Sequence, residues 1–428
     1  MLRMTRRGAA LLLVAACGGG VADRLRDAPI TEVRHRGFRT DLPDSDRGNA
    51  VFDDAVFSAD GAFLVTQHHL GGLRVWDGHT GTRLSHLNPA RDGNEPWIVD
   101  GATARYVSRR QGQAGLALFD LRTGAVAAVI PEPADSPAVM LGLGPAGSVV
   151  IARPGVIEIW SLDSATRRAS LVSPYPRERY RPSCTGGVFA TYNDKKCWEL
   201  SPKGRWLAMA VTPDQPPYAR SRFALLDLQA LTTVNVTPPD SVGDSHLAAF
   251  AFSDDERLLA IGTDRGVWIR DLAEGKWVSH ASGQHRRNAL LGAMGFADGG
   301  ARLVVLGDQM QVSTIEVATG HVLGRIEPPT DDWEGIFRMS RDGSRVVLYH
   351  FTSDILEVID GRTSKRTGWI CPFFCNSRHN PVPVSFVLSP DGRTVAAAHR
   401  YGAGLWNPTS DRLIMPLNDS TLPPRRPR

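Results

Sequence analysis

The chain lacks the motifs by which most enzymes and membrane-spanning proteins are identified from sequence. Its 428 residues contain no Gly-x-Ser-x-Gly elbow and no His-Glu-x-x-His zinc motif. Its N-terminal apolar run, residues 9–16, is too short to cross a bilayer. Residues Gly142 to Gly147 fit a dinucleotide fingerprint, but no helix pattern follows them, so we interpret them as a turn. We therefore expect no catalytic residue and no cofactor.

The chain also has little net charge where a nucleic-acid binder would need it. Its formal net charge is +4 and its pI is about 8.9. Six of its cations lie near the two ends: Arg3, Arg6, Arg7, Arg425, Arg426 and Arg428. The body between them offers no clustered basic face, which argues against a nucleic-acid partner. We expect the basic tail, residues 419–428, to be disordered; contact with anionic lipid or envelope polymer is the alternative.

Cysteine is scarce, and its placement is informative. Beyond Cys17 there are four cysteines, in two local pairs: Cys184 with Cys197 and Cys371 with Cys375. In an exported chain such pairs are most simply disulfides that staple loops. The alternatives are free thiols in a reducing compartment, or a shared metal site, which the predicted distance between the two pairs disfavours.

The most informative feature present is a module that repeats eight times. Each copy has a strand of alternating apolar residues that ends at a polar position and is followed by a tight turn. Leu73-Arg74-Val75-Trp76-Asp77, followed by Thr80-Gly81, is the clearest copy. The marker positions are Asp77, Asp120, Ser161, Asp227, Asp271, Glu316, Asp360 and Asn407. Most lie roughly 41 to 47 residues apart, whereas the step from Ser161 to Asp227 is longer and must contain an insertion.

A second turn repeats upstream of the marker. It reads Ser58-Ala59-Asp60-Gly61 in the first copy, with relatives at residues 201–204, 253–256, 340–343 and 389–392. Ser and Asp side chains can hydrogen-bond the backbone at such a corner, and glycine relieves its strain. The apolar stretches between the turns are too short for helices and are predicted to be strands.

These residues resemble the WD40-type β-propeller family, and Val75-Trp76-Asp77 and the Ser-x-Asp-Gly turns carry the resemblance. The resemblance implies an all-β fold: a single propeller of four-stranded antiparallel blades over residues 49–418. Several copies depart from the family pattern, since Ser, Glu or Asn replaces Asp at three of the markers. Eight blades are predicted, with seven as the alternative. Aromatic residues at aligned positions, Trp76, Phe119, Trp160 and Trp406, are expected to pack between blades.

The N-terminus has the pattern of an export signal. Arginines precede the apolar run, which ends in Leu13-Val14-Ala15-Ala16-Cys17-Gly18. This segment resembles the lipobox of bacterial lipoproteins, which implies cleavage before Cys17 and acyl chains on that cysteine. An ordinary signal peptide with a chance cysteine is the alternative, and Arg6-Arg7 gives a weak indication of twin-arginine export. The prediction is a signal peptide over residues 1–17 and a lipid-anchored protein of the bacterial cell envelope, outside the cytoplasm.

Residues 18–48 are expected to form a flexible tether that lets the propeller stand off the membrane. Ile30 to His35 could instead be an edge strand that helps to close the ring.

Three histidines fall at one position of the repeat. His68 follows Asp60 at the interval by which His350 follows Asp342 and His399 follows Asp391. They are predicted to lie at the end of the second strand in blades one, seven and eight, which adjoin once the ring closes. Neutral imidazoles can bind zinc or copper, but no carboxylate or cysteine lies beside them at a recognisable spacing. We expect surface or packing histidines and no metal, with a metal site as the alternative.

Blade four has two unusual loops, an insertion at residues 175–196 and a Pro-rich segment at 213–220. In WD40-like rings the loops before a first strand and after a second strand share one face. We hypothesise that this face recognises partners, which would be envelope proteins. Its candidate anchors are Arg177, Arg179, Tyr180, Tyr192, Tyr218, Arg220, Arg400 and Tyr401. The predicted function is a non-catalytic, membrane-anchored protein-binding scaffold; the alternative is a propeller hydrolase or lyase, or a metal-binding protein, that uses the histidine face. The sequence assigns no small-molecule ligand.

Overall fold

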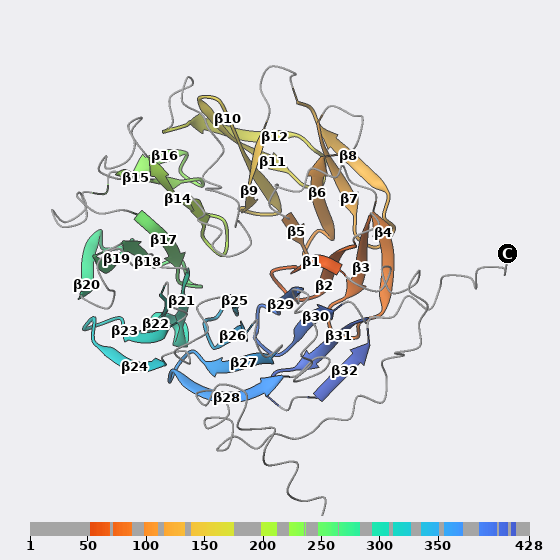
Figure 1. Ribbon diagram of the computed structural model, residues 1–428. Helices are drawn as coiled ribbons and strands as arrows, with labels where there is room; N and C mark the ends of the chain where they lie inside the picture. Colours follow the sequence, from red (N-terminus) through yellow and green to blue (C-terminus); the bar gives the residue numbers. More distant parts are fainter. Residues whose placement is uncertain are drawn as a thin grey trace, which may run out of the picture.

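A computed structural model shows a ring of eight four-stranded antiparallel sheets (Figure 1). The residues that the structure describes are 52–68, 72–87, 98–109, 115–132, 138–174, 198–211, 222–234, 236, 247–263, 265–282, 293–307, 311–326, 335–350, 355–370, 385–399, 402–409 and 412–416. Each sheet consists of four strands that are consecutive in sequence, so each is one blade. The fold is therefore an all-β propeller with eight blades, as predicted; the seven-bladed alternative is wrong.

The blades are numbered in chain order, and their strands have the following bounds. Blade one comprises β1 (Phe52–Phe57), β2 (Phe63–His68), β3 (Leu73–Asp77) and β4 (Arg83–Leu87). Blade two comprises β5 (Ile98–Asp100), β6 (Arg105–Arg109), β7 (Leu116–Asp120) and β8 (Val126–Ile130). Blade three comprises β9 (Val139–Gly144), β10 (Ser148–Arg153), β11 (Val156–Ser161) and β12 (Arg167–Val172). Blade four comprises β13 (Trp198–Leu200), β14 (Trp206–Val211), β15 (Arg222–Asp227) and β16 (Thr232–Val234).

Blade five comprises β17 (Leu247–Phe252), β18 (Leu258–Thr263), β19 (Gly266–Asp271) and β20 (Lys276–Ser282). Blade six comprises β21 (Ala293–Ala297), β22 (Arg302–Leu306), β23 (Val312–Glu316) and β24 (Val322–Ile326), with one short 3-10 turn, η2 (Asp298–Gly300). Blade seven comprises β25 (Gly335–Met339), β26 (Arg345–His350), β27 (Ile355–Asp360) and β28 (Lys365–Ile370). Blade eight comprises β29 (Ser385–Leu388), β30 (Val395–His399), β31 (Gly402–Asn407) and β32 (Arg412–Pro416).

The strand ends agree with the repeat read from the sequence. All eight marker positions, from Asp77 to Asn407, are the last residue of the third strand of a blade. The segment Pro145–Gly147, inside the glycine-rich stretch of blade three, is a turn between β9 and β10, as expected. Strand segments begin and end where Gly, Pro, Asp and Ser interrupt the apolar runs.

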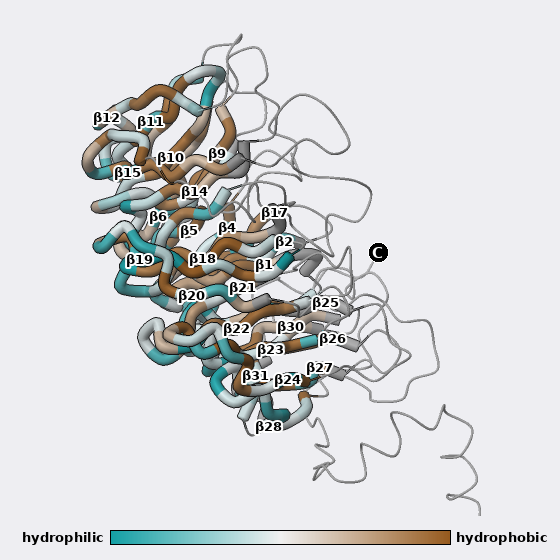
Figure 2. The backbone as a smooth tube through the Cα atoms, turned by 90° about the vertical axis from the view of Figure 1, so that its left-hand side faces the viewer, coloured by the Kyte–Doolittle hydropathy of each residue, from teal (hydrophilic) through white to brown (hydrophobic). Residues whose placement is uncertain are grey.

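The core is divided among the seams between blades. Eight apolar clusters are buried, and each one joins two neighbouring blades. The aligned aromatic residues pack there as expected, for example Phe119 between blades one and two and Trp406 between blades seven and eight. Because sheets bury apolar side chains on both faces here, strands through the middle of each blade are largely apolar (Figure 2).

In the part of the chain that the structure describes, the ring closes without an exchange of strands between blades. Blades one and eight each consist of four strands of their own, and the seam between them is apolar. Trp76 of blade one is almost fully buried there against Ala396, Ala398 and Leu405 of blade eight, and its indole N–H donates to Thr66 Oγ1 over 2.9 Å. Side-chain packing between the first and last blades therefore contributes directly to closure.

Candidate functional site

Most of the predicted recognition residues lie outside the described residues. These are Cys17, Cys184, Cys197, Cys371, Cys375, Arg177, Arg179, Tyr180, Tyr192, Tyr218, Arg220, Arg400 and Tyr401, together with the tether and the tail. The lipid anchor, the disulfides and the anchors of the loop face therefore stay predictions. The strands do place the two loops of blade four, because residues 175–197 connect β12 to β13 and residues 212–221 connect β14 to β15.

The backbone places the three histidines at equivalent positions. His68, His350 and His399 are the last residues of β2, β26 and β30, the second strands of blades one, seven and eight. In the ring these blades are neighbours (Figure 1). Among the described residues, no group of three His, Cys, Asp or Glu side chains could hold a metal ion.

The turns between first and second strands lie at the other ends of these strands, on the face opposite the strand ends that carry the three histidines. We call this face the turn face. In blade eight, Ser389 Oγ donates to Asp391 Oδ1 over 2.7 Å, and Asp391 Oδ1 also accepts the Arg393 N–H over 3.1 Å. The Thr394 N–H closes the turn by donating to Ser389 Oγ over 2.9 Å. Gly392 has a φ of 67°, and a Cβ there would lie 2.8 Å from Arg345 Cγ of blade seven. The Ser-x-Asp-Gly sequence is thus a local device that fixes the turn against the preceding blade.

Blade four lacks this aspartate and takes a carboxylate from blade five. Its turn has Lys203 where blade eight has Asp391. Glu256 Oε1 accepts from Ser201 Oγ over 2.5 Å and from the Lys203 N–H over 2.7 Å, with a longer contact of 3.4 Å from the Arg205 N–H. Glu256 stands where other turns have glycine, at a φ of 64°. Glu256, in this uncommon backbone conformation, therefore completes the hydrogen bonds of the turn in the neighbouring blade.

The Asp and Asn marker residues accept backbone N–H groups in the turns between third and fourth strands, which lie on the same face. Asp227 Oδ1 accepts the N–H groups of Gln229 and Ala230, each over 3.0 Å, and Asp227 Oδ2 accepts from Arg205 Nη2 over 2.8 Å. Burial is the largest influence on the Asp227 carboxyl and raises its pKa. The hydrogen bonds from Arg205 and the two backbone groups outweigh it, so the pKa is lowered and the carboxylate stays charged.

The same pairing of an arginine with the marker aspartate occurs in four blades. Arg105 pairs with Asp120, Arg257 with Asp271 and Arg345 with Asp360, in addition to the pair in blade four. In blade eight the marker is the uncharged Asn407, so Arg393, which holds the position equivalent to Arg205, has no marker carboxylate to pair with. The Arg393 side chain is 87% exposed, and its one described ion pair is a distant one, with Asp391 at 3.8 Å.

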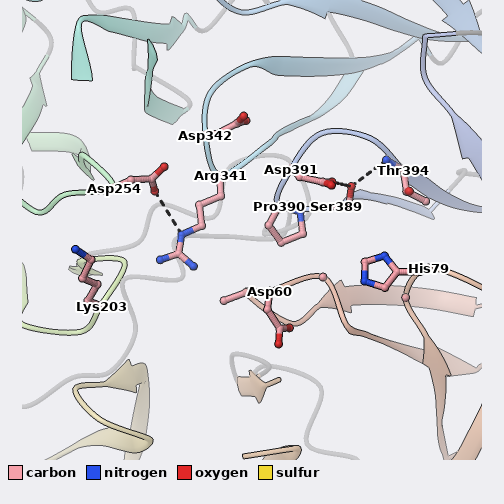
Figure 3. A pocket seen from close by; sticks show the side chains of 13 residues that line it. Asp60, His79, Lys203, Asp254, Arg341, Asp342, Ser389, Pro390, Asp391 and Thr394 are labelled. Carbon is pink, nitrogen blue, oxygen red and sulfur yellow. Dashed lines mark hydrogen bonds and ion pairs between the residues drawn. The ribbon is translucent and has the colours of Figure 1, made fainter. Parts of the chain in front are cut away.

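A cavity of about 430 Å³ lies on the turn face and receives side chains from five blades. Its charged or titratable lining residues are Asp60, His79, Lys203, Asp254, Arg341, Asp342 and Asp391 (Figure 3). Arg341 Nε lies 3.7 Å from Asp254 Oδ1, which links blade seven to blade five. Carboxylates outnumber the two permanent cations four to two, so this cavity, which we call the inner cavity, has an acidic balance.

A second cavity, of about 480 Å³, adjoins it along the seam of blades seven and eight. Asp342 and Asp391 line both, and we call the second one the outer cavity. Its other charged residues are Arg345, Arg362 and Arg393, and Ser344, Asn407 and Thr409 add polar groups. The two cavities therefore adjoin at these two aspartates. We call the pair of cavities the groove; its inner part is acidic and its outer part is basic.

Sequence reasoning missed this groove and the contribution of Glu256. The signal for Glu256 was present, because a turn without aspartate in blade four is followed by a turn without glycine in blade five. The signal for Arg393 was the asparagine at the marker position of blade eight. Within the described part of the chain, no helix is long and apolar enough to span a membrane.

Comparisons with known proteins support the fold alone. No protein-family model and no curated protein sequence matches the chain. A computationally designed protein, Ika8, aligns with a TM-score of 0.56 and 15% identity over 84% of this chain and 96% of its own. Dihydro-heme d1 dehydrogenase NirN aligns with a TM-score of 0.48 and 15% identity, over 75% of this chain and 66% of NirN. The β-propeller domain of Cps50 (Swd1) from Myceliophteria thermophila aligns with a TM-score of 0.45 and 12% identity, over 84% of this chain and 96% of that one.

Proposed function

We propose that this protein is a non-catalytic, protein-binding β-propeller, held outside the cytoplasm at a bacterial envelope by a lipid on Cys17. The observation that carries the binding role is the inner cavity, where polar side chains from five blades meet on one face. Hydrogen-bonded turns fix several of these side chains in place. Rigid strands that position polar groups at turns and loops are the usual basis of recognition.

The charges on the turn face suit recognition better than proton transfer. Burial is the largest influence on Asp342 and raises its pKa, but hydrogen bonds from Ser340 and Ser344 outweigh it, and the pKa is lowered. The marker aspartates Asp77, Asp120 and Asp271 likewise have lowered pKa values: burial raises them, and hydrogen bonds within the turns outweigh it. Carboxylates that stay charged near neutral pH present a fixed pattern to a partner, whereas a general base needs a pKa near the working pH.

The membrane anchor and the loop face rest on the sequence. The lipobox-like segment ending at Cys17 supports lipid attachment and export. The insertion at residues 175–196 lies between β12 of blade three and β13 of blade four, and the segment at 213–220 lies between β14 and β15 of blade four. The strand ends that they join lie on the face opposite the turn face. We propose that face as the main contact surface for envelope proteins, in addition to the inner cavity on the turn face.

The test is crosslinking of the tagged, full-length protein in its native cells, followed by identification of the captured proteins. We expect a reproducible set of envelope proteins, and we expect Cys17→Ser to lose both the membrane fraction and that set. Variants in which residues 175–196 or 213–220 are replaced by short Gly-Ser linkers should capture less. Capture at background level would overturn the binding role, and undiminished capture by the two loop variants would remove the loop face from it.

A metal-dependent activity is the second candidate, because His68, His350 and His399 end equivalent strands of three adjacent blades. It predicts that the purified protein retains zinc or copper in a stoichiometric amount. It also predicts that replacement of all three histidines by alanine releases the metal. A metal-free protein that captures its partners normally would leave the scaffold as the explanation.

A further inference from the structure

The groove along the seam of blades seven and eight carries charged groups that do more than stabilise the fold. Its two parts share Asp342 and Asp391, which come from equivalent Ser-x-Asp-Gly turns of adjacent blades. In each turn one carboxylate oxygen, Oδ1, serves the turn: Asp342 accepts from Ser340 Oγ and the Ser344 N–H, and Asp391 accepts from Ser389 Oγ and the Arg393 N–H. This fixes the orientation of both carboxylates and leaves their charge at the groove.

The turns that carry these aspartates are also fixed to each other. The Arg341 N–H donates to the Pro390 carbonyl oxygen over 3.0 Å, which joins the two turns through their backbones. Gly392 packs against Arg345 and Ser340 with no room for a side chain. The floor of the groove is therefore preorganised, which lowers the entropic cost of binding.

One arginine in the basic part of the groove is exposed where the repeat has lost its marker aspartate. Arg205 in blade four is held by Asp227, whereas the marker of blade eight is Asn407 and the equivalent Arg393 is 87% exposed. The two other arginines, Arg345 and Arg362, are paired with Asp360 and Asp298 at 2.9 and 2.6 Å. Arg393 is thus the most available cation, with Asn407 and Thr409 beside it in the lining.

We propose that this groove binds an extended peptide segment of a partner protein that carries one basic and one acidic side chain a few residues apart. The basic side chain pairs with Asp391 and Asp342, and the acidic side chain pairs with Arg393, so the peptide replaces the long contact of 3.8 Å between Arg393 and Asp391. A ligand with negative charge alone would be repelled by the two aspartates, and a ligand with positive charge alone would be repelled by the three arginines. The ligand therefore needs charges of both signs. The proposal rests on the proposed binding function and specifies a second contact surface for it, on the turn face.

The test measures the affinity of short labelled peptides for the purified, full-length protein by fluorescence anisotropy. The probes are Gly-Ser peptides that carry one Arg and one Glu separated by two to four residues, with all-basic, all-acidic and neutral peptides of the same length. We expect the mixed-charge peptides to bind about tenfold more tightly than the others, because each charge-assisted hydrogen bond contributes on that order. Salt should weaken this binding.

Three variants locate the binding and leave the turns intact. Asp391→Asn keeps a side-chain oxygen for the turn, Arg393→Gln changes an exposed side chain, and Asn407→Asp offers Arg393 a competing carboxylate. We expect each to weaken mixed-charge binding about tenfold. The matched controls, Asp163→Asn in blade three and Lys276→Gln in blade five, lie outside the lining and should have no effect.

Two results would overturn the proposal. One is an equal affinity for all-basic or all-acidic peptides, which would indicate a simple ion site. The other is an affinity that the three groove variants leave unchanged. Because the assay uses purified protein, these results leave the capture of envelope proteins to be judged separately: capture without peptide discrimination would remove the groove and keep the scaffold.

Discussion

Blades four and eight begin with almost the same turn and stabilise it in different ways. The sequences are Ser201-Pro202-Lys203-Gly204 and Ser389-Pro390-Asp391-Gly392, which differ only at the third residue. Blade eight supplies its own carboxylate, whereas blade four receives that of Glu256 from blade five. The two blades also differ at the marker, where Asp227 holds Arg205 but Asn407 leaves Arg393 exposed.

The difference shows how an eroded repeat can keep its structure. The turn keeps its hydrogen bonds to a carboxylate, because Ser201 Oγ donates to Glu256 as Ser389 Oγ donates to Asp391, and the Arg205 N–H donates over 3.4 Å where the Arg393 N–H does so in blade eight. The acceptor side chain, Glu256, belongs to another blade, so the loss of the aspartate in one repeat is offset by a change in the next. Where a loss is not offset, as at Asn407, a charged side chain is left available for binding.

The largest expected effect on stability comes from removing the contact between Glu256 of blade five and the turn of blade four. Glu256→Ala removes the acceptor of the Ser201 Oγ and Lys203 N–H hydrogen bonds, and Ser201 is buried. We expect the free energy of unfolding to fall by about 2 kcal/mol, measured by urea denaturation. Backbone strain does not change the comparison, because Glu and Ala are both disfavoured at the φ of 64°.

The matched control is Asp254→Ala in the same turn. Asp254 is exposed, and its ion pair within the described residues is long, 3.7 Å to Arg341, so its loss should cost less than about 0.5 kcal/mol. Equal effects of the two substitutions would contradict the role of Glu256.

A second prediction converts blade four into the pattern of blade eight. Lys203→Asp combined with Glu256→Gly gives blade four its own carboxylate and gives blade five a glycine at the left-handed position. We expect the double variant to be at least as stable as the original protein, by up to about 1 kcal/mol, because the strain at residue 256 is relieved. Each single variant should be destabilised by about 1 kcal/mol. Glu256→Gly alone leaves the turn of blade four without a carboxylate, and Lys203→Asp alone gives that turn two. Simple additivity in urea denaturation would show that the two positions are not coupled.

The fold was predictable because it depends on patterns that recur. Markers such as Asp77 and turns such as Ser389 to Gly392 specified eight blades and the strand ends, and aromatic residues such as Trp406 indicated the seams. The contacts between blades were not predictable in this way. The contact between Glu256 and Ser201 joins residues 55 positions apart, and no local pattern encodes it. The groove likewise requires the ring, because Asp342 and Asn407 meet only when blades seven and eight are packed together.

The marker residues Asp227 of blade four and Asn407 of blade eight can be compared through the pH dependence of the free energy of unfolding. Asp227→Asn gives blade four the asparagine of blade eight and removes a charge that Arg205 holds. We expect a loss of about 1 kcal/mol at pH 7, a modest value because Arg205 is about half exposed. The folded-state pKa of Asp227 is below its ordinary value of 3.8, so the carboxylate contributes its full stability above that pH.

This contribution is lost as the pH falls through the lowered pKa of the folded state. The deficit of Asp227→Asn should therefore shrink when urea denaturation is repeated at pH 3. A deficit that stays constant or grows on acidification would show that the charge of Asp227 is not the cause.

The smallest expected effect is the reverse change in blade eight. Asn407→Asp keeps the acceptor for the Thr409 N–H and Oγ1, which donate over 2.9 and 2.7 Å, and it adds a charge facing Arg393. We expect a gain of about 0.5 kcal/mol at pH 7, since the new ion pair is exposed. In an Arg393→Gln background the same change should give no gain, and a gain of equal size there would exclude Arg393 as the partner. Asn407→Asp also neutralises the basic part of the groove, so stability should rise while peptide binding weakens. This opposition is expected when a side chain serves binding at a cost in stability.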